Sequence, residues 1–127
     1  KMHKLMYLVQ RESLMYDKEV LFQEDFFGWK YGPVLKSVRN EYAKQNPYES
    51  VHGSVSSRAK KLVGSVLKRY GVLSSWRLSS LSHGEFSWKC SRNGLNAGDN
   101  GDVKLKVSAM RVDAAHELSL RRTGRYY

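Results

Sequence analysis

The feature that most constrains the fold is a regular hydrophobic pattern between Arg58 and Tyr70. Apolar side chains recur there at the spacing of one helical face: Ala59, Leu62, Val63, Val66, Leu67 and Tyr70. The other face is basic, with Arg58, Lys60, Lys61, Lys68 and Arg69. Ser56 or Ser57 can cap the first turn, and Gly71 follows the last. The pattern predicts an amphipathic helix that packs one face on a core and exposes cations on the other.

Two shorter patterns add helices on either side of this one. Met2–Tyr16 is apolar on most of its sides, which predicts a helix at the centre of the core. Ser74 is expected to cap a helix that runs to about Ser82 and is buried through Leu78 and Leu81.

The last part of the chain contains a junction, a loop and a final helix. Residues 83–94, HGEFSWKCSRNG, crowd aromatic and polar side chains together, and residues 95–102 have the composition of a loop. Ser108 is expected to cap a helix that runs to about Arg122. One side of this helix carries the apolar residues Met110, Ala114 and Leu118.

Residues 19–32 interrupt the helical patterns. Short apolar pairs separated by acidic residues favour extended segments there. Gly32-Pro33 marks a break, and Pro33 suits the first turn of a helix to about Ala43. A turn-rich loop, residues 44–57, follows. The sequence therefore predicts a mainly α, single compact helical domain over residues 1–127, with a short irregular or β-like excursion around residues 19–32.

Composition fits one globular domain. The chain has 127 residues, of which 41% are hydrophobic and 27% charged, and it has no apolar run long enough to span a membrane. A single cysteine, Cys90, cannot form an internal disulfide, which suits the reducing cytoplasm. Because the chain begins inside a helical pattern without a cap, we expect that a native N-terminal segment precedes it.

The net charge of +10 is unevenly distributed. Residues 1–50 contain eight Lys and Arg and seven Asp and Glu, a net charge of +1. Residues 51–127 contain fourteen and five, a net charge of +9. This half is expected to attract a polyanion or an acidic protein surface, or to serve only as a solvated surface.

No pattern of catalytic or metal-binding residues is present. The histidines, His3, His52, His83 and His116, are scattered, and no HExxH, CxxC, EF-hand, GxSxG or P-loop spacing occurs. A Cys90–His83 dyad is the strongest catalytic candidate, and it depends on two residues meeting in space. The sequence therefore favours a protein that is not an enzyme and has no cofactor or metal.

Residues 58–80 have the order of a helix-turn-helix motif, which gives DNA binding as an alternative function. In that interpretation Lys68 and Arg69 contact phosphates, and Arg77 faces the major groove with Trp76. Any two sequential helices joined by a short turn share this order. Both interpretations of residues 58–80 stay open.

Three stretches together resemble one known family. They are MHKLMYLVQ (residues 2–10), FFGWKYGPVLKSVRNEY (residues 26–42) and VLKRYGVLSSWRLSSLSHGEFSWKCSR (residues 66–92). They are similar to the Panacea domain, also called the SocA-like antitoxin or phage-associated GepA-like domain. The likeness covers most of residues 2–92 in order and spacing. Gly28 stands where the family usually has alanine, and a helix that normally precedes Lys4 is absent.

The resemblance implies a non-enzymatic, largely helical antitoxin. Such proteins neutralise a co-encoded toxin by direct binding. One variation implies that the antitoxin hands its toxin to a bacterial protease as an adaptor. Nucleic acid is a secondary partner, and the identity of the toxin is not implied.

Within the matched blocks we assign two kinds of residue. Trp29, Gly32, Pro33 and Trp88 are expected to build the core corner, because large rings need burial and glycine allows unusual backbone angles. Partner contact is expected of the residues Lys30, Tyr31, Arg39, His83 and Arg92. His83 and Arg92 are also expected to form a polar network around Trp88.

Overall fold

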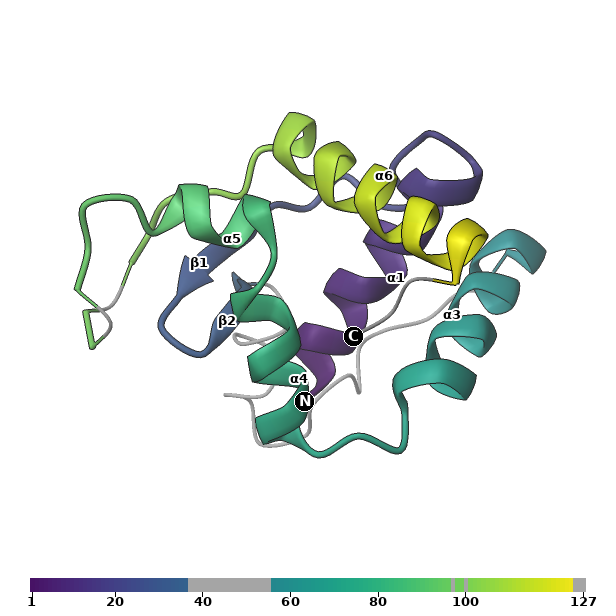
Figure 1. Ribbon diagram of the computed structural model, residues 1–127, viewed down its shortest axis with the longest axis horizontal. Coiled ribbons are helices and arrows are strands. Elements are labelled where there is room, and N and C mark those ends of the chain that lie inside the picture. The colour runs from purple at the N-terminus through teal and green to yellow at the C-terminus, as the bar shows by residue number, and fades with distance from the viewer. Residues whose placement is uncertain (37–55, 97, 100, 125–127) are drawn as a thin grey trace.

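The computed structural model of the protein describes residues 1–36, 56–96, 98–99 and 101–124 (Figure 1). Within these residues the chain forms five helices and one two-stranded antiparallel sheet. The helices are α1 (Met2–Tyr16), α3 (Ser57–Tyr70), α4 (Ser75–His83), α5 (Phe86–Ser91) and α6 (Val107–Thr123). The strands are β1 (Phe26–Trp29) and β2 (Gly32–Leu35). The predicted mainly α fold with a short β excursion is confirmed.

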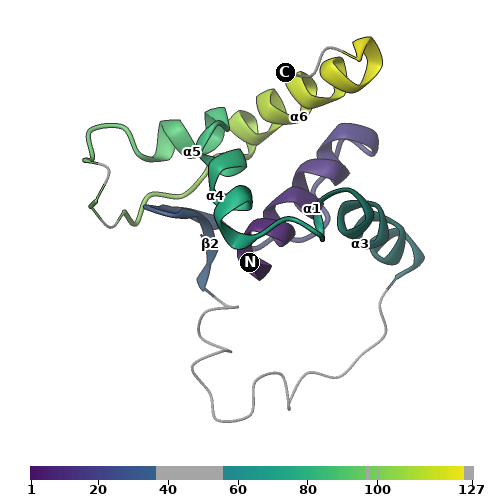
Figure 2. The same ribbon diagram turned by 60° about the horizontal axis from the view of Figure 1, so that its bottom comes forward.

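Helix α1 forms the centre of the fold, as its apolar composition predicted. It contacts α3, α4, α6 and β2, and Figure 2 shows it between α3 and α6. Every residue from Tyr7 to Met15 is buried. The Tyr7 ring meets Phe26 of β1 edge-on, with 5.6 Å between ring centroids. Because α1 has neighbours on all sides, its polar residues are buried together with its apolar ones.

The excursion forms a tight hairpin. Phe26 pairs with Leu35 and Trp29 with Gly32, so a two-residue turn, Lys30-Tyr31, connects the strands. Gly32 has φ of +124°, a backbone conformation that other residues rarely adopt. The outer edge of β1 is covered by a later segment, since Gly28 N–H donates to Val103 O at 2.9 Å and Leu105 N–H donates to Phe26 O at 2.9 Å.

The prediction that Pro33 begins a helix is wrong. Pro33, Val34 and Leu35 belong to β2, opposite Gly28, Phe27 and Phe26. Proline is tolerated on an edge strand, where no ladder hydrogen bond is required of it. The other edge of β2 is closed by α1, because Leu35 N–H donates to His3 Nδ1 at 3.1 Å. Residues 37–43 of the predicted helix, and residues 44–55 of the loop after it, lie outside the described residues.

The amphipathic helix and the helix after it begin at predicted caps. Ser56 Oγ accepts from Ala59 N–H, and Ser74 Oγ accepts from Arg77 N–H, each at 3.1 Å. Helix α4 buries Leu78 as expected. However, the expectation that Leu81 is buried is wrong, because 44% of its surface is exposed.

The last third of the chain differs from prediction at two points. Helix α6 begins at Val107, and its N-cap is Lys106 instead of Ser108. Its predicted apolar side, Met110, Ala114 and Leu118, is buried. The aromatic junction at residues 83–94 contains a helix, α5, that the sequence did not predict. No helix in the described part of the chain is long and apolar enough to cross a membrane.

Candidate partner-binding site

The turn of the hairpin packs against α4 and brings predicted contact residues together. Ser79 Oγ donates to the Tyr31 carbonyl oxygen at 2.8 Å. One turn further along α4, His83 forms a hydrogen bond with the backbone of Lys30. Lys30-Tyr31 is therefore held at both ends by residues on one face of α4.

Trp88 of α5 lies behind this turn, between two of the predicted site residues. The His83 ring stacks on it with 4.2 Å between centroids and 14° between planes. The Arg92 guanidinium lies 5.8 Å from its centroid. Trp88 Nε1 donates to the Trp29 carbonyl at 2.8 Å, which ties α5 to β1. Burial, with Lys4 and Arg92 nearby, lowers the pKa of His83, so the ring is neutral at pH 7.

Arg92 is buried and faces inward. Its guanidinium donates to the carbonyl oxygens of Gly28, Asn96 and Asp99 at 3.1, 2.9 and 2.6 Å. These bonds fix the loop after α5 against β1. Arg92 therefore positions this corner, and its donors are turned away from any partner at the surface.

Close backbone approach explains both glycines of the corner. A Cβ on Gly32 would lie 2.7 Å from Ser82 Oγ, and a Cβ on Gly28 would lie 1.8 Å from Ser91 Oγ. Pro33 is buried between α1 and α4. In this chain Ser91 occupies the space that an alanine at residue 28 would need.

Two large aromatic side chains are exposed beside this corner. Tyr31 is 62% exposed and Trp76 is 75% exposed. The Lys30 ammonium lies 5.3 Å from the Tyr31 ring centroid. Trp76 is one helical turn before Ser79, which holds Tyr31, so both rings border the same part of α4. We call the surface formed by Lys30, Tyr31, Trp76, Ser79 and His83 the hairpin–α4 face.

The other predicted contact residues lie elsewhere. Arg39 is outside the described residues. Lys68 and Arg69 are exposed on the last turn of α3, and Arg77 is exposed on α4 next to Trp76. Trp76 appeared in the sequence interpretation only as a DNA contact. Trp76 does not fall on the apolar stripe of its helix, and this was the signal in the sequence that could have marked it as an exposed aromatic.

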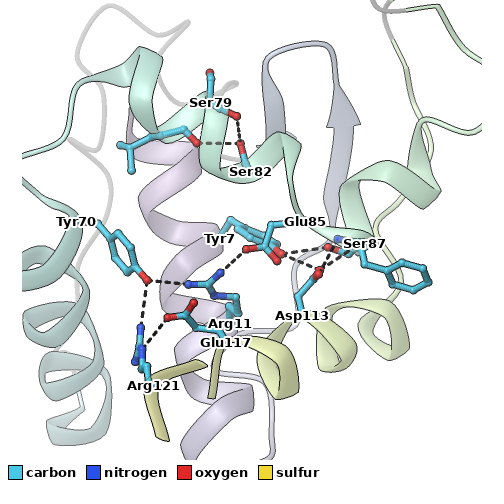
Figure 3. Close-up of polar contacts among 12 residues, drawn as sticks. Tyr7, Arg11, Tyr70, Ser79, Ser82, Glu85, Ser87, Asp113, Glu117 and Arg121 are labelled. Atoms are coloured by element: carbon cyan, nitrogen blue, oxygen red, sulfur yellow. Dashed lines mark hydrogen bonds and ion pairs between the residues drawn. The ribbon is translucent and has the colours of Figure 1, made fainter. Parts of the chain in front are cut away.

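Beneath the surface, a buried polar network joins α1 to α5 and α6 (Figure 3). Tyr7 OH donates to Asp113 Oδ2 at 3.1 Å and lies 3.1 Å from Ser87 Oγ. Asp113 also accepts from the backbone N–H groups of Phe86 and Ser87 at 2.6 and 2.9 Å. Burial, with Glu85 and Asp113, raises the pKa of Tyr7, so the phenol keeps its proton.

A second part of the network joins α1 to α3 and the α4–α5 turn. Arg11 donates to Glu85 and, at 2.8 Å, to Tyr70 OH. Burial raises the pKa of Glu85 from 4.5 to about 7, although Arg11 opposes the shift. Arg121 of α6 donates to the same Tyr70 hydroxyl at 3.2 Å, and it bonds Glu12 and Glu117 at 2.9 Å each. The network joins four helices through groups that the sequence interpretation did not assign.

The protein-family model described as antitoxin SocA-like, Panacea domain, matches residues 2–89. The chain belongs to this family. The match extends from α1 through the hairpin, α3 and α4 into α5. No curated protein and no solved structure matches the chain.

Within the first matched block of this SocA-like domain, residues 2–10, the structure shows the roles of Tyr7 and Gln10. Tyr7 is the hydroxyl that joins Ser87 and Asp113. Gln10 binds the extended segment after α1, because its side chain accepts from Leu21 N–H at 2.7 Å and donates to the Phe22 carbonyl at 2.9 Å. Both residues of this SocA-like domain are buried and structural.

The described part of the SocA-like domain offers no group of three or more His, Cys, Asp or Glu side chains that could hold a metal ion. The residues of the buried network bond one another inside the domain. The hairpin–α4 face combines exposed rings with a rigid support, which is an arrangement suited to binding a protein surface.

Proposed function

We propose that this SocA-like antitoxin domain neutralises a toxin protein by binding it directly through the hairpin–α4 face. The observation that carries the proposal is the pair of exposed rings, Tyr31 and Trp76, on a braced turn. Exposed Trp and Tyr are the residue types most often found at binding hot spots. The turn is fixed before binding by Ser79 and His83, so little conformational entropy is lost when a partner docks.

The proposal is of binding and not of catalysis. The toxin is expected to be encoded beside this protein, and the complex to form in the cytoplasm. Lys30 and His83 are assigned to the edges of the contact, while Trp29, Gly32, Pro33, Trp88 and Arg92 support it. Arg39 stays a predicted contact.

The test is co-expression with the product of the neighbouring gene, with growth and complex formation as readouts. Tyr31→Ala and Trp76→Ala are expected to weaken the complex about 30-fold or more each, the size of a hot-spot loss. Phe86→Ala is the matched control, because Phe86 is an aromatic side chain that is 48% exposed outside this face. Equal affinity for all three variants, or toxicity unchanged by the wild-type protein, would contradict the proposal.

The same co-expression experiment distinguishes a proteolytic adaptor from a protein that only sequesters the toxin. If the protein is a proteolytic adaptor, the amount of toxin falls on co-expression, whereas simple sequestration leaves it unchanged.

DNA binding through Lys68, Arg69 and Arg77 stays a prediction. It requires an affinity for promoter DNA that falls steeply with salt, with a slope of about −0.9 per neutralised phosphate.

A further inference from the structure

A groove of about 540 Å3 lies between α1, α3 and the end of α6. Its lining includes Glu12 and Tyr16 of α1, Lys61, Ser65 and Arg69 of α3, and Arg121 of α6. None of its residues belongs to the hairpin–α4 face. The volume is within the range of ligand-binding sites, about 300–1,000 Å3.

Two cations of this groove have no acidic partner among the residues that the structure describes. Arg58 at one end bonds Asp17 at 2.8 Å, and Arg121 bonds Glu12 and Glu117. Lys61 and Arg69 are exposed, and neither forms an ion pair with another residue that the structure describes. Their charge is therefore available to an anionic group from another molecule.

The middle of the groove has the opposite character. Ser65 is exposed and lies between Lys61 and Arg69, and its Oγ donates to Glu12 Oε2 at 3.2 Å. Because the hydroxyl proton is committed to Glu12, the lone pairs of Ser65 can only accept. Glu12 itself is 2% exposed, and among the described residues its Oε1 has no hydrogen-bond partner. The centre of the groove thus favours a hydrogen-bond donor, which the free lone pairs of Ser65 can accept.

The spacing of the three α3 residues determines which kind of ligand can contact all of them. Lys61, Ser65 and Arg69 are four residues apart, so they share one face of α3 at intervals of about 6 Å. In an extended peptide, side chains on one face recur about every 6.8 Å. An extended segment with acidic side chains at its first and fifth positions and a donor at its third has the complementary pattern.

We infer that this groove docks an extended segment of a partner protein, with an acidic residue, a donor and an acidic residue at alternate positions. Tyr16, which is 54% exposed, and Leu62 supply the apolar wall beside it. A second copy of this chain is disfavoured by its net charge of +10. A nucleic-acid strand offers phosphates to the rim, but phosphodiester groups only accept hydrogen bonds and give no donor to Ser65 between them.

The test is a nuclear magnetic resonance titration of the full chain with capped peptides. One peptide is Glu-Ala-Lys-Ala-Glu, and the other, Glu-Glu-Lys-Ala-Ala, has the same composition in a different spacing. The first is expected to shift the amide signals of α1 and α3 around the groove and to bind several-fold more tightly than the second. Lys61→Glu and Arg69→Glu are each expected to weaken it about tenfold, because reversal replaces a modest attraction by a repulsion of similar size.

Matched controls lie on the same helix. Lys60→Glu and Lys68→Glu make the same charge change on exposed residues that do not line the groove, and they are expected to have little effect. Equal binding of both peptides, equal losses in all four variants, or no shifts at millimolar peptide would overturn the inference. So would tighter, Lys61-dependent binding of a thymidine pentanucleotide. No toxin is involved, so failure here leaves the function proposed for the hairpin–α4 face untouched.

Discussion

Glu85 is the residue whose chemistry is most altered by the fold. It lies in the turn between α4 and α5, where its carboxyl meets Arg11 and is almost removed from water. Loss of hydration raises its pKa from 4.5 to about 7, and Asp113 adds to the shift. Near neutral pH the carboxyl therefore carries a proton in much of the folded population but not in the unfolded chain.

This shift predicts a pH dependence of stability with a definite sign. Between pH 4.5 and pH 7 the folded state binds the Glu85 proton and the unfolded state does not, so the free energy of unfolding falls as pH rises. The stability of the wild-type protein relative to Glu85→Gln is expected to decrease by roughly 3 kcal/mol across this window. Urea denaturation of both proteins at a series of pH values measures the difference.

The comparison with Glu85→Gln removes contributions from histidine. Burial lowers the pKa of both His3 and His83, so each favours the folded state as pH rises, opposite to Glu85. These terms are the same in both proteins and cancel. A difference in stability that is constant with pH would mean that Arg11 keeps Glu85 ionised throughout.

At the scale of elements, α5 depends on another helix for its N-terminus. It has six residues, and its N-cap residue, Glu85, makes no side-chain capping bond. The cap is instead supplied by α6, whose Asp113 accepts from the Phe86 and Ser87 N–H groups. An isolated helix of this length is unstable in water, so this tertiary contact fixes it.

Asp113→Asn is therefore expected to lower the free energy of unfolding by more than its small change in shape suggests. The amide keeps one acceptor oxygen but turns an NH2 group toward a second N–H, which leaves a buried donor unpaired at a cost of about 2 kcal/mol. Urea denaturation measures the loss, and hydrogen exchange at Phe86 and Ser87 should accelerate. Asp102→Asn, on an exposed carboxylate that forms an ion pair with Lys36 at the surface, should change stability by less than about 0.5 kcal/mol. Similar effects of the two variants would contradict the capping role.

The helices that the sequence predicted differ from the helix that it did not predict in where the residues that determine them lie. Helices α1, α3, α4 and α6 carry apolar patterns within their own residues, and the caps of α3 and α4 are local serines. Helix α5 is capped by a residue 26 positions beyond Ser87, so no local pattern could show it. Pro33 was assigned to a helix by a local rule, but pairing with β1 and closure by His3 determine its strand.

At the scale of the whole molecule, α6 completes a core that the family match only partly covers. The match ends at residue 89, whereas Met110, Ala114 and Leu118 of α6 are buried in the core. Arg121 of α6 also neutralises Glu12, which is 2% exposed. Without α6, α1 would carry an unpaired buried carboxylate and an uncovered apolar side.

A chain that ends at residue 105 is expected to lose cooperative folding. The missing helix removes apolar burial, the α5 cap and the partner of Glu12 together, and each loss is large compared with the stability of a small domain. Near-ultraviolet circular dichroism and the spread of amide proton signals measure the loss of fixed packing. The Asp102→Asn full chain is a folded control, and a truncated chain with a cooperative urea transition like the wild type would contradict the expectation.

The candidate site was also predictable only in part, because contacts between distant parts of the chain place its residues. Lys30, Tyr31 and His83 were chosen from matched blocks, and the structure places them in one corner. Trp76 could be assigned to the hairpin–α4 face only once Ser79 was found to hold Tyr31. Arg92 was expected at the surface because arginine is common in interfaces, but three carbonyl oxygens hold it inside. The roles of these residues in binding stay predictions.

The reach of α6 back to α5 and α1 also affects how the protein is made. A ribosome releases the chain from its N-terminus, so α1 emerges with its charged residues long before Asp113 and Arg121. Until those two leave the exit tunnel, the nascent polypeptide has neither its α5 cap nor the counter-ion of Glu12. Folding of this domain is thus expected to be completed only after α6 has emerged, which leaves the nascent polypeptide briefly open to chaperones and proteases.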